Sequence, residues 1–250
     1  MIALFGALNS ELHGMFKSIA VEQRTPWHTW RIVEGVYAGR QVLLVRTGMG
    51  KDPALHAAGH ILKHYPARMV ISLGFAGSID PRLQAGDLLL CRRLFCDSPV
   101  TADKGYASDG KLLARAARAL KGTALTLLTG DTLTVDRLVA QPAEKQQLRS
   151  AYGVQAVDME SYWLAETAAR RGLPFLAVRA ISDGLDESLP PFDRFTGEDG
   201  QVLLRQALRH FISTSSDLFK LPRLGLHAWR AQRSLTACLQ TLIPALDGEN

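Results

Sequence analysis

Carboxylates follow two buried apolar runs in the second half of the chain, at the point where each run ends. The run VQAV precedes Asp158, Met159 and Glu160, and the run FLAVRAIS ends before Asp183. A helix-like segment that stops near 172–174 lies between them, which predicts a strand-helix-strand unit. Such a unit brings the acids to one edge of a sheet, where open α/β folds place ligands. Because no metal-ligand cluster accompanies them, these acids suit hydroxyl recognition and proton transfer.

A further acid, Glu11, lies near the N-terminus. Residues 2–5 form a short apolar run, and residues 9–11 then open a helix after the small residues at 6–7. Any acid in the first turn of a helix is favoured by the helix dipole, so the local pattern favours a solvated surface residue. The acids elsewhere in the chain favour a functional role instead.

Alternating strands and helices with little linker material indicate one layered α/β domain. Several predicted strands must position the acids, at 2–5, in two runs within 31–46, at 69–74, at 86–91 and in TLLTGD, which ends at Gly130-Asp131. The predicted helices lie at 53–64, 111–121 and 142–152. Pro142 suits the first turn of the last helix.

Two small-residue segments follow predicted strands and allow a ligand to approach the backbone. Gly48 and Gly50 flank Met49, which offers a soft apolar surface. The segment FAGSID is predicted to be a loop after the strand at 69–74. The dinucleotide fingerprint is absent, because its third glycine is missing. The candidate ligand contacts of the second segment are Phe75, Ala76 and Gly77.

Composition restricts the class of protein. The chain has 250 residues, of which 47% are hydrophobic, with a formal net charge of +5 and three cysteines that form no zinc-like or redox pair. This predicts a packed core in a reducing cytoplasm, without a nucleic-acid partner. The N-terminus reads as a first strand rather than a signal peptide, and no run is long and apolar enough to span a bilayer. His56, His60 and His64 share a helix face, but the metalloprotease order is absent, which favours packing or exposure over metal binding.

The segments GALNSE, GMGK, SLGFAG, AVDMES and RAISD, in this order, resemble the nucleoside phosphorylase and nucleosidase family over roughly residues 1–215. The chain is similar to the branch of methylthioadenosine/S-adenosylhomocysteine nucleosidases. Its AVDMES and RAISD segments and its basic tail also resemble hopanoid-associated nucleoside phosphorylases, which are linked to the removal of adenine from adenosylhopane. The resemblance implies a three-layer α/β/α domain at 1–215 around a mixed, largely parallel sheet, a C-terminal amphipathic helical extension at 216–250, and a homodimer. It implies no metal or cofactor, with phosphate as an optional co-substrate.

On the sugar side, the resemblance assigns roles to five residues. Glu11 would order the attacking water near the anomeric carbon. Met159 and Glu160 would hold the ribose, Glu160 through the sugar hydroxyls. Asp158 replaces a glutamate that is common in the family, so its reach is shorter by one methylene. Met49 would lie near the ribose and its 5′ substituent.

On the base side, Asp183 aligns with the aspartate that protonates or hydrogen-bonds N7 of the purine. Ser182 would orient that carboxylate. Leu133 and Thr134 fall in a loop whose backbone would contact the base. Phe75 and Leu133 are candidates for apolar walls, and each is equally compatible with a core position.

The resemblance implies cleavage of the N-glycosidic bond of a purine nucleoside, with a 5′-modified adenosine such as adenosylhopane as the substrate. Methylthioadenosine, S-adenosylhomocysteine and futalosine are alternative substrates. Phosphorylases of the family place an arginine where this chain has Ser72, which favours water over phosphate as the acceptor, although Arg46 could bind phosphate. A nucleoside-binding module without turnover is the non-enzyme alternative, and Glu11, Glu160 and Asp183 count against it.

Residues 217–243 form a basic amphipathic segment beyond the nucleosidase pattern. One predicted helical stripe holds Lys220, Arg223, His227 and Arg230, and a second holds Leu221, Leu224, Ala228, Ala231, Leu235, Cys238 and Leu242. Such a helix can lie on the inner face of an anionic membrane, or it can pack on the domain or on a second subunit. Under the membrane hypothesis, deletion of 217–250 should abolish liposome binding and spare the cleavage of soluble adenosine analogues.

Overall fold

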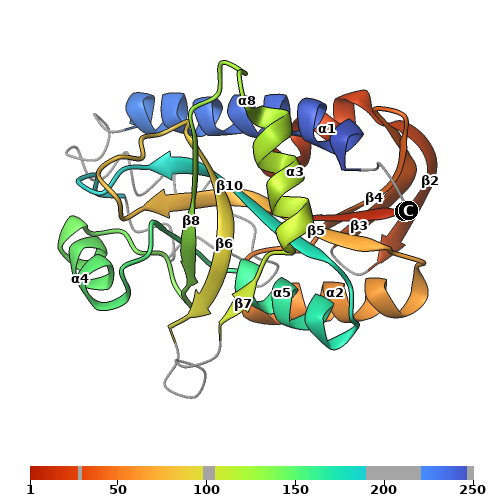
Figure 1. Ribbon diagram of the computed structural model, residues 1–250, viewed down its shortest axis with the longest axis horizontal. Coiled ribbons are helices and arrows are strands. Elements are labelled where there is room, and N and C mark those ends of the chain that lie inside the picture. The colour runs from red at the N-terminus through yellow and green to blue at the C-terminus, as the bar shows by residue number, and fades with distance from the viewer. Residues whose placement is uncertain (28–29, 98–104, 190–220, 247–250) are drawn as a thin grey trace.

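A computed structural model describes residues 1–27, 30–97, 105–189 and 221–246 of the chain (Figure 1). Its strands are β1 Ile2–Gly6, β2 Ala20–Trp27, β3 Trp30–Tyr37, β4 Arg40–Arg46, β5 Met69–Ser78, β6 Leu88–Cys96, β7 Tyr106–Ala107, β8 Leu127–Thr134, β9 Ala156–Asp158 and β10 Phe175–Asp183. Its helices are α1 Asn9–Ser18, α2 Lys51–His64, α3 Gly110–Leu120, α4 Pro142–Tyr152, α5 Ser161–Arg170 and α8 Leu221–Ala245.

The strands form one ten-stranded mixed sheet. At its centre β4, β1, β5 and β10 run parallel, and β2 and β3 extend it beyond β4 as antiparallel neighbours. β10 also pairs with β6, β6 with β8, β8 with β9, and β9 returns to β5. The strands β5, β10, β6, β8 and β9 therefore close into a ring. The mixed sheet expected from the sequence is confirmed.

The central strands are buried because they are covered on both faces. Every residue of β1 is buried, as are nearly all residues of β10, which is why these strands read as continuous apolar runs rather than as alternating patterns. One core cluster packs α2 and α5 against the sheet, and a second packs α1, α3 and α8. Figure 1 shows α1 and α8 along one side of the sheet and α2 and α5 along the opposite side, so the expected helix-sheet-helix layering is confirmed.

Helix α8 belongs to the second core cluster. Ala231, Leu235, Cys238 and Leu242 of its predicted apolar stripe are buried, and the helix contacts α1, α3 and β10. α8 therefore packs on the domain, which was one of the alternatives for this segment. In the rest of that stripe, Ala228 is exposed and Leu224 is half-buried. The Leu221 side chain, and Lys220 of the basic stripe, lie outside what the structure describes. Within the described residues, no helix is long and apolar enough to cross a bilayer.

Two predicted segments differ from the structure, and one strand was not expected. The predicted loop FAGSID is instead largely strand, because β5 continues through Ser78. The strand predicted to end at Gly130-Asp131 likewise continues to Thr134 as β8. Strand β2 was not predicted, and its residues are mostly exposed, so no apolar alternation marks it. The other predicted helices and strands are present, with their ends shifted by a few residues.

Candidate active site

Glu11 is buried at the start of α1, which contradicts its local interpretation as a solvated acid. It is 6% exposed, and its two carboxylate oxygens accept hydrogen bonds from the backbone N–H groups of Leu8 at 2.9 Å and Phe75 at 2.8 Å. Burial raises the pKa of Glu11 above its ordinary value, while these two N–H groups and the charge of Arg179 oppose the rise. Glu11 is therefore a buried carboxyl that two backbone N–H groups hold in place and whose pKa is raised.

Glu160 lies immediately before α5, at the carboxyl end of β9. Its Oε1 accepts a hydrogen bond of 2.7 Å from the backbone N–H of Gly50. Gly50 has a φ of 89°, a left-handed conformation that favours glycine. Burial, followed by the charges of Asp158 and Glu11, raises the pKa of Glu160 to about 8. The charge of Glu11 is thus one of the causes of the raised pKa of Glu160.

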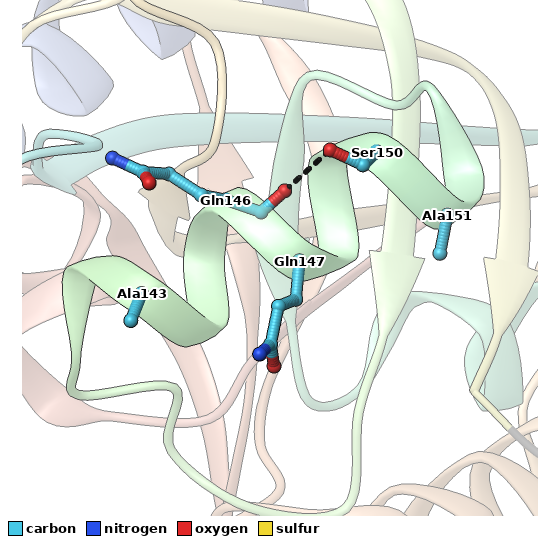
Figure 2. A pocket seen from close by; sticks show the side chains of 5 residues that line it. All are labelled: Ala143, Gln146, Gln147, Ser150 and Ala151. Atoms are coloured by element: carbon cyan, nitrogen blue, oxygen red, sulfur yellow. Dashed lines mark hydrogen bonds between the residues drawn. The ribbon is translucent and has the colours of Figure 1, made fainter.

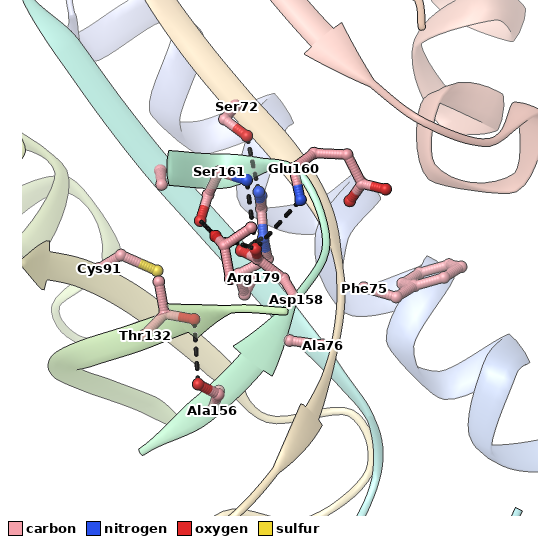
Figure 3. Close-up of polar contacts among 12 residues, drawn as sticks. Ser72, Phe75, Ala76, Cys91, Thr132, Ala156, Asp158, Glu160, Ser161 and Arg179 are labelled. Carbon is pink, nitrogen blue, oxygen red and sulfur yellow. Dashed lines mark hydrogen bonds and ion pairs between the residues drawn. The ribbon is translucent and has the colours of Figure 1, made fainter. Parts of the chain in front are cut away.

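Both carboxylate oxygens of Asp158 accept hydrogen bonds from other groups of the protein. Its Oδ2 accepts from Arg179 Nε at 2.7 Å, and its Oδ1 accepts from the Thr134 hydroxyl at 2.7 Å. The backbone N–H groups of Glu160 and Ser161 also donate to Oδ1, each at 3.2 Å. Figure 3 shows the Arg179 guanidinium between Ser72 and Asp158, with the Glu160 carboxylate directed away from that pair. Asp158 thus positions Glu160 and the start of α5, and its contact with a sugar stays a prediction.

Asp183 ends β10 and is 2% exposed. The Ser182 hydroxyl donates to its Oδ1 at 2.7 Å, as the family resemblance implied. The ammonium group of Lys145, from α4, donates to its Oδ2 at 2.5 Å. Burial raises the pKa of Asp183, and the charge and hydrogen bond of Lys145 act in the opposite direction. Asp183 is therefore a buried acid with a cationic partner.

Strand β5 brings the two acid groups to one sheet edge. A Cβ atom at Gly74 would lie 3.1 Å from Glu11 Oε1, and a Cβ atom at Gly77 would lie 3.1 Å from Asp183 Oδ2. These glycines are three residues apart, which corresponds to about 10 Å along a strand. Glu11 therefore lies beside Gly74, and Asp183 lies beside Gly77, three residues farther along β5.

The other predicted contacts fall into two groups. Met49, Phe75, Gly77 and Met159 are half-buried, whereas Ala76 is buried in β5. Leu133 and Thr134 do not lie in a loop, and both are fully buried in β8.

Leu133 belongs to a small core cluster, and the Thr134 hydroxyl binds Asp158 and accepts from Tyr162 N at 3.0 Å. The prediction that this segment contacts the base through a loop is therefore wrong in its structural basis. Arg46, the predicted phosphate ligand, ends β4 and is half-buried.

Two charged residues of the site were missed in the sequence. Arg179 lies within the apolar run of β10, and Lys145 lies within α4. Both are at most 1% exposed. Arg179 donates to Ser72 Oγ at 2.7 Å as well as to Asp158. The available signal was a lone arginine within the run FLAVRAIS, because a cation in a buried strand needs an anionic partner.

A surface depression on α4 has no part in this site. It is lined by Ala143, Gln146, Gln147, Ser150 and Ala151, and the Ser150 hydroxyl donates to the Gln146 carbonyl at 3.0 Å (Figure 2). None of these side chains is titratable, and all project from one exposed helix. Among the residues that the structure describes, no group of three or more His, Cys, Asp or Glu side chains is arranged to hold a metal ion.

Comparison with known proteins identifies relatives. A family model described as the phosphorylase superfamily matches residues 2–213. A 5′-methylthioadenosine/S-adenosylhomocysteine nucleosidase of Marinomonas sp. (strain MWYL1) is 28% identical over 193 residues, or 70% of this chain and 84% of that protein. The fold is also similar to solved structures. The nucleosidase of the same name from Neisseria meningitidis, in complex with methylthio-immucillin-A, has a TM-score of 0.75 at 22% identity, covering 98% of this chain and 97% of that one. A futalosine hydrolase of Helicobacter pylori strain 26695 has a TM-score of 0.76 at 18% identity, covering 97% of each chain.

Proposed function

Because the chain belongs to the phosphorylase superfamily, we propose that it cleaves the N-glycosidic bond of a purine nucleoside and releases the base. The observation that carries this proposal is the arrangement of three buried or half-buried acids around β5. The charge of Glu11 contributes to the raised pKa of Glu160, Glu11 lies beside Gly74 of β5, and Asp183 lies beside Gly77 of the same strand. Such an arrangement offers acids to the sugar and to the leaving base at the same time.

The sugar end of the site would use Glu11 and Glu160. Breaking an N-glycosidic bond passes through a sugar that resembles an oxocarbenium ion, and an acid held on the ribose hydroxyls keeps the sugar in its reacting geometry. Glu160 is suited to this because its backbone partner Gly50 fixes it in place. Glu11 would order and deprotonate the attacking water, since burial raises its pKa and so makes its carboxylate a stronger base.

The base end would use Asp183. A purine leaves more readily once N7 accepts a proton, and burial raises the pKa of Asp183 toward the range where a carboxyl can carry that proton. The Ser182 hydroxyl holds the carboxyl in orientation. A positioned general acid typically contributes about 10²–10⁴ in rate. Asp183→Asn should therefore reduce the release of base by that factor while the circular dichroism spectrum stays that of the wild type.

Water is the proposed acceptor. Ser72 stands where phosphorylases of the family have an arginine, and the nearby Arg179 is buried with its guanidinium bound to Asp158 and Ser72. Arg46 remains the candidate phosphate ligand if phosphate is used. Hydrolysis predicts that the release of base is independent of phosphate concentration. A rate that rises in proportion to added phosphate would establish phosphorolysis instead.

The proposed substrate is a 5′-modified adenosine such as adenosylhopane. Methylthioadenosine or S-adenosylhomocysteine is favoured as an alternative by the Marinomonas relative, and futalosine by the similar Helicobacter structure. A lipid-linked nucleoside accords with membrane contact through 217–243. That contact would now involve only the outer face of α8, where Leu226 is 45% exposed and Trp229 is 52% exposed. The homodimer also stays a prediction, which sedimentation velocity can test.

The deciding experiment measures adenine release from a panel of 5′-substituted adenosines, with and without phosphate. The panel comprises methylthioadenosine, S-adenosylhomocysteine, futalosine (for which the released base is hypoxanthine) and adenosylhopane in detergent micelles. Asp183→Asn is the matched inactive control. We expect phosphate-independent release from at least one member and the highest kcat/KM for adenosylhopane. Release of no base from any member would overturn the enzymatic proposal and favour a binding module.

A further inference from the structure

Helix α4 is attached to the molecule in an unusual way. Among its residues, all of which the structure describes, Lys145 alone is buried, and its side chain is completely inaccessible to solvent. Its neighbours Gln146 and Gln147 are exposed. Lysine is among the residues that are almost never fully buried without a partner, because desolvating an ammonium group is costly. The position of this lysine therefore requires compensation from the groups around it.

Compensation comes from one short segment, the turn that begins at Asp183. Lys145 Nζ lies 2.5 Å from Asp183 Oδ2, 2.6 Å from the Gly184 carbonyl oxygen and 3.1 Å from the Glu187 carbonyl oxygen. An ammonium group has three N–H donors, so all three are used. The lysine thus fixes both the acid and the backbone that carries it.

We propose that Lys145 is a positioning residue for the acid Asp183, which it holds in place and whose charge it balances when the proton leaves. This inference rests on the proposed function, because it assigns Lys145 a part in the protonation of the leaving base. Lys145 touches Asp183 rather than the substrate.

The physical reason is differential stabilisation. When Asp183 gives its proton to N7, the Asp183 O–H bond breaks, the N7–H bond forms and a carboxylate remains. A cation at Oδ2 interacts more strongly with this carboxylate than with the neutral acid, so it stabilises the state that develops as the bond to the base breaks. In a buried site this interaction is poorly screened by water. Removing the charge should therefore make Asp183 a weaker acid and slow the release of base.

The charged groups that face Asp183 in the described part of the chain come from two elements. Lys145 lies on α4, and Glu187 follows in the turn, where its charge opposes ionisation of Asp183. Glu187 is in turn bound to α8, through Arg223 at 2.6 Å and His227 Nδ1 at 3.1 Å. The turn is consequently tied to α4 by the lysine and to α8 by the glutamate.

Two substitutions separate charge from geometry. Lys145→Gln keeps donors for the carbonyl oxygens but removes the charge, and Lys145→Arg keeps the charge but cannot place its donors at the same three points. Lys111→Gln, at an exposed lysine of α3, makes the same chemical change away from the site. Asp183→Asn serves to assign the NMR signal of the Asp183 carboxyl, because that signal is missing from the spectrum of this variant.

The first measurement needs no substrate. Carbon-13 NMR of protein labelled at the aspartate side-chain carboxyl reports the titration midpoint of Asp183. In Lys145→Gln we expect this midpoint to rise by about 1–3 pH units, the usual effect of losing an opposite charge. It should stay near the wild-type value in Lys145→Arg and in Lys111→Gln. An unchanged midpoint in Lys145→Gln, or an equal rise in Lys145→Arg, would overturn the inference.

The second measurement is kcat for adenine release against pH. We expect Lys145→Gln to lose about tenfold to a hundredfold in kcat, with the alkaline limb of its profile moved upward, because a weaker acid keeps its proton to higher pH. A lowered kcat with an unmoved limb contradicts the inference and indicates a merely structural role. If Lys145→Gln does not fold, Lys145→Arg decides: an Asp183 midpoint at the wild-type value supports a role for the charge, and a midpoint that rises although the charge is kept overturns it. Wild-type protein that releases no base refutes the proposed function. The titration midpoint of Asp183 tests the effect of Lys145 on that acid independently of activity.

Discussion

Arg179 and Asp158 form an ion pair inside the protein, with 2.7 Å between Nε and Oδ2 and side chains that are 2% and 0% exposed. The pair joins β10 to the end of β9, directly before Met159 and Glu160. The candidate sugar-binding carboxylate is therefore carried by a buried electrostatic link between two strands rather than by a flexible loop.

Breaking this link from the arginine side should be costly. Arg179→Met leaves the Asp158 carboxylate buried without its cation, and we expect a loss of about 3–5 kcal/mol in the free energy of unfolding. Adding Asp158→Asn should recover part of that loss. Urea denaturation measures both. Arg170→Met, which removes an exposed pair with Glu166, should cost less than about 1 kcal/mol. Equal losses at Arg179 and Arg170 would contradict a structural role for the buried pair.

The stability of the protein should depend on pH through Glu160. Its pKa is about 8 in the folded protein against an ordinary 4.5, so the folded state binds this proton more tightly than the unfolded state. The contribution is complete below pH 4.5 and is lost as the pH rises to about 8. Glu160→Gln should lack this decline, so its stability relative to wild type should increase across that window. Thermal melts between these limits test it, with Glu22→Gln at an exposed site as the control. Parallel curves for wild type and Glu160→Gln would disprove the shift.

Space beside Gly77 should be needed for catalysis. A methyl group there would lie 3.1 Å from Asp183 Oδ2, closer than most real contacts, so Gly77→Ala should displace the acid by a few tenths of an ångström. We expect roughly a tenfold loss in kcat, since misplacement by about 1 Å costs about a hundredfold. Gly59→Ala, in α2, has nothing within 4 Å of its new methyl group and should leave kcat unchanged. Wild-type kcat in Gly77→Ala would show that Asp183 tolerates displacement.

Helix α8 should be required for folding. Leu235 is fully buried in the second core cluster, and Leu235→Ala should cost about 2–5 kcal/mol in the free energy of unfolding. Trp229→Ala, at a side chain that is 52% exposed, should change it by about 0.5 kcal/mol or less. Deletion of 217–250 should therefore unfold the domain rather than spare cleavage of soluble analogues. A folded, active deletion variant, identified by its melting transition, would show that the core does not need α8.

The sequence predicted those features that depend on local pattern. Apolar runs located the central strands, and the acids that follow those runs located Glu160 and Asp183. The expected parallel pairing is wrong for these two acids, because β10 runs parallel to β5 whereas β9 runs antiparallel to it. Pro142 marked the first turn of α4, and Gly153 ends that helix in a left-handed conformation with a φ of 64°.

Features that depend on long-range pairing were not predictable. Strand β2 is exposed, so its pairing with β3 leaves no periodic signal in the sequence. Thr134 looked like a loop residue near the base because strand ends are poorly defined by composition. Lys145 and Asp183 are 38 residues apart, and nothing local indicates that they meet. For the same reason the sequence does not indicate that Arg179 binds Asp158.

The ring formed by β5, β10, β6, β8 and β9 has a mechanical consequence for the shortest of its strands. A segment as brief as Ala156–Asp158 would fray if it sat at an open border, because its few backbone hydrogen bonds could exchange with water. Closure of the ring gives β9 a paired strand on each side. Glu160, which follows β9, is therefore attached to a strand that is held at both of its edges. Weakening the pairing of any strand in this ring should therefore displace Glu160.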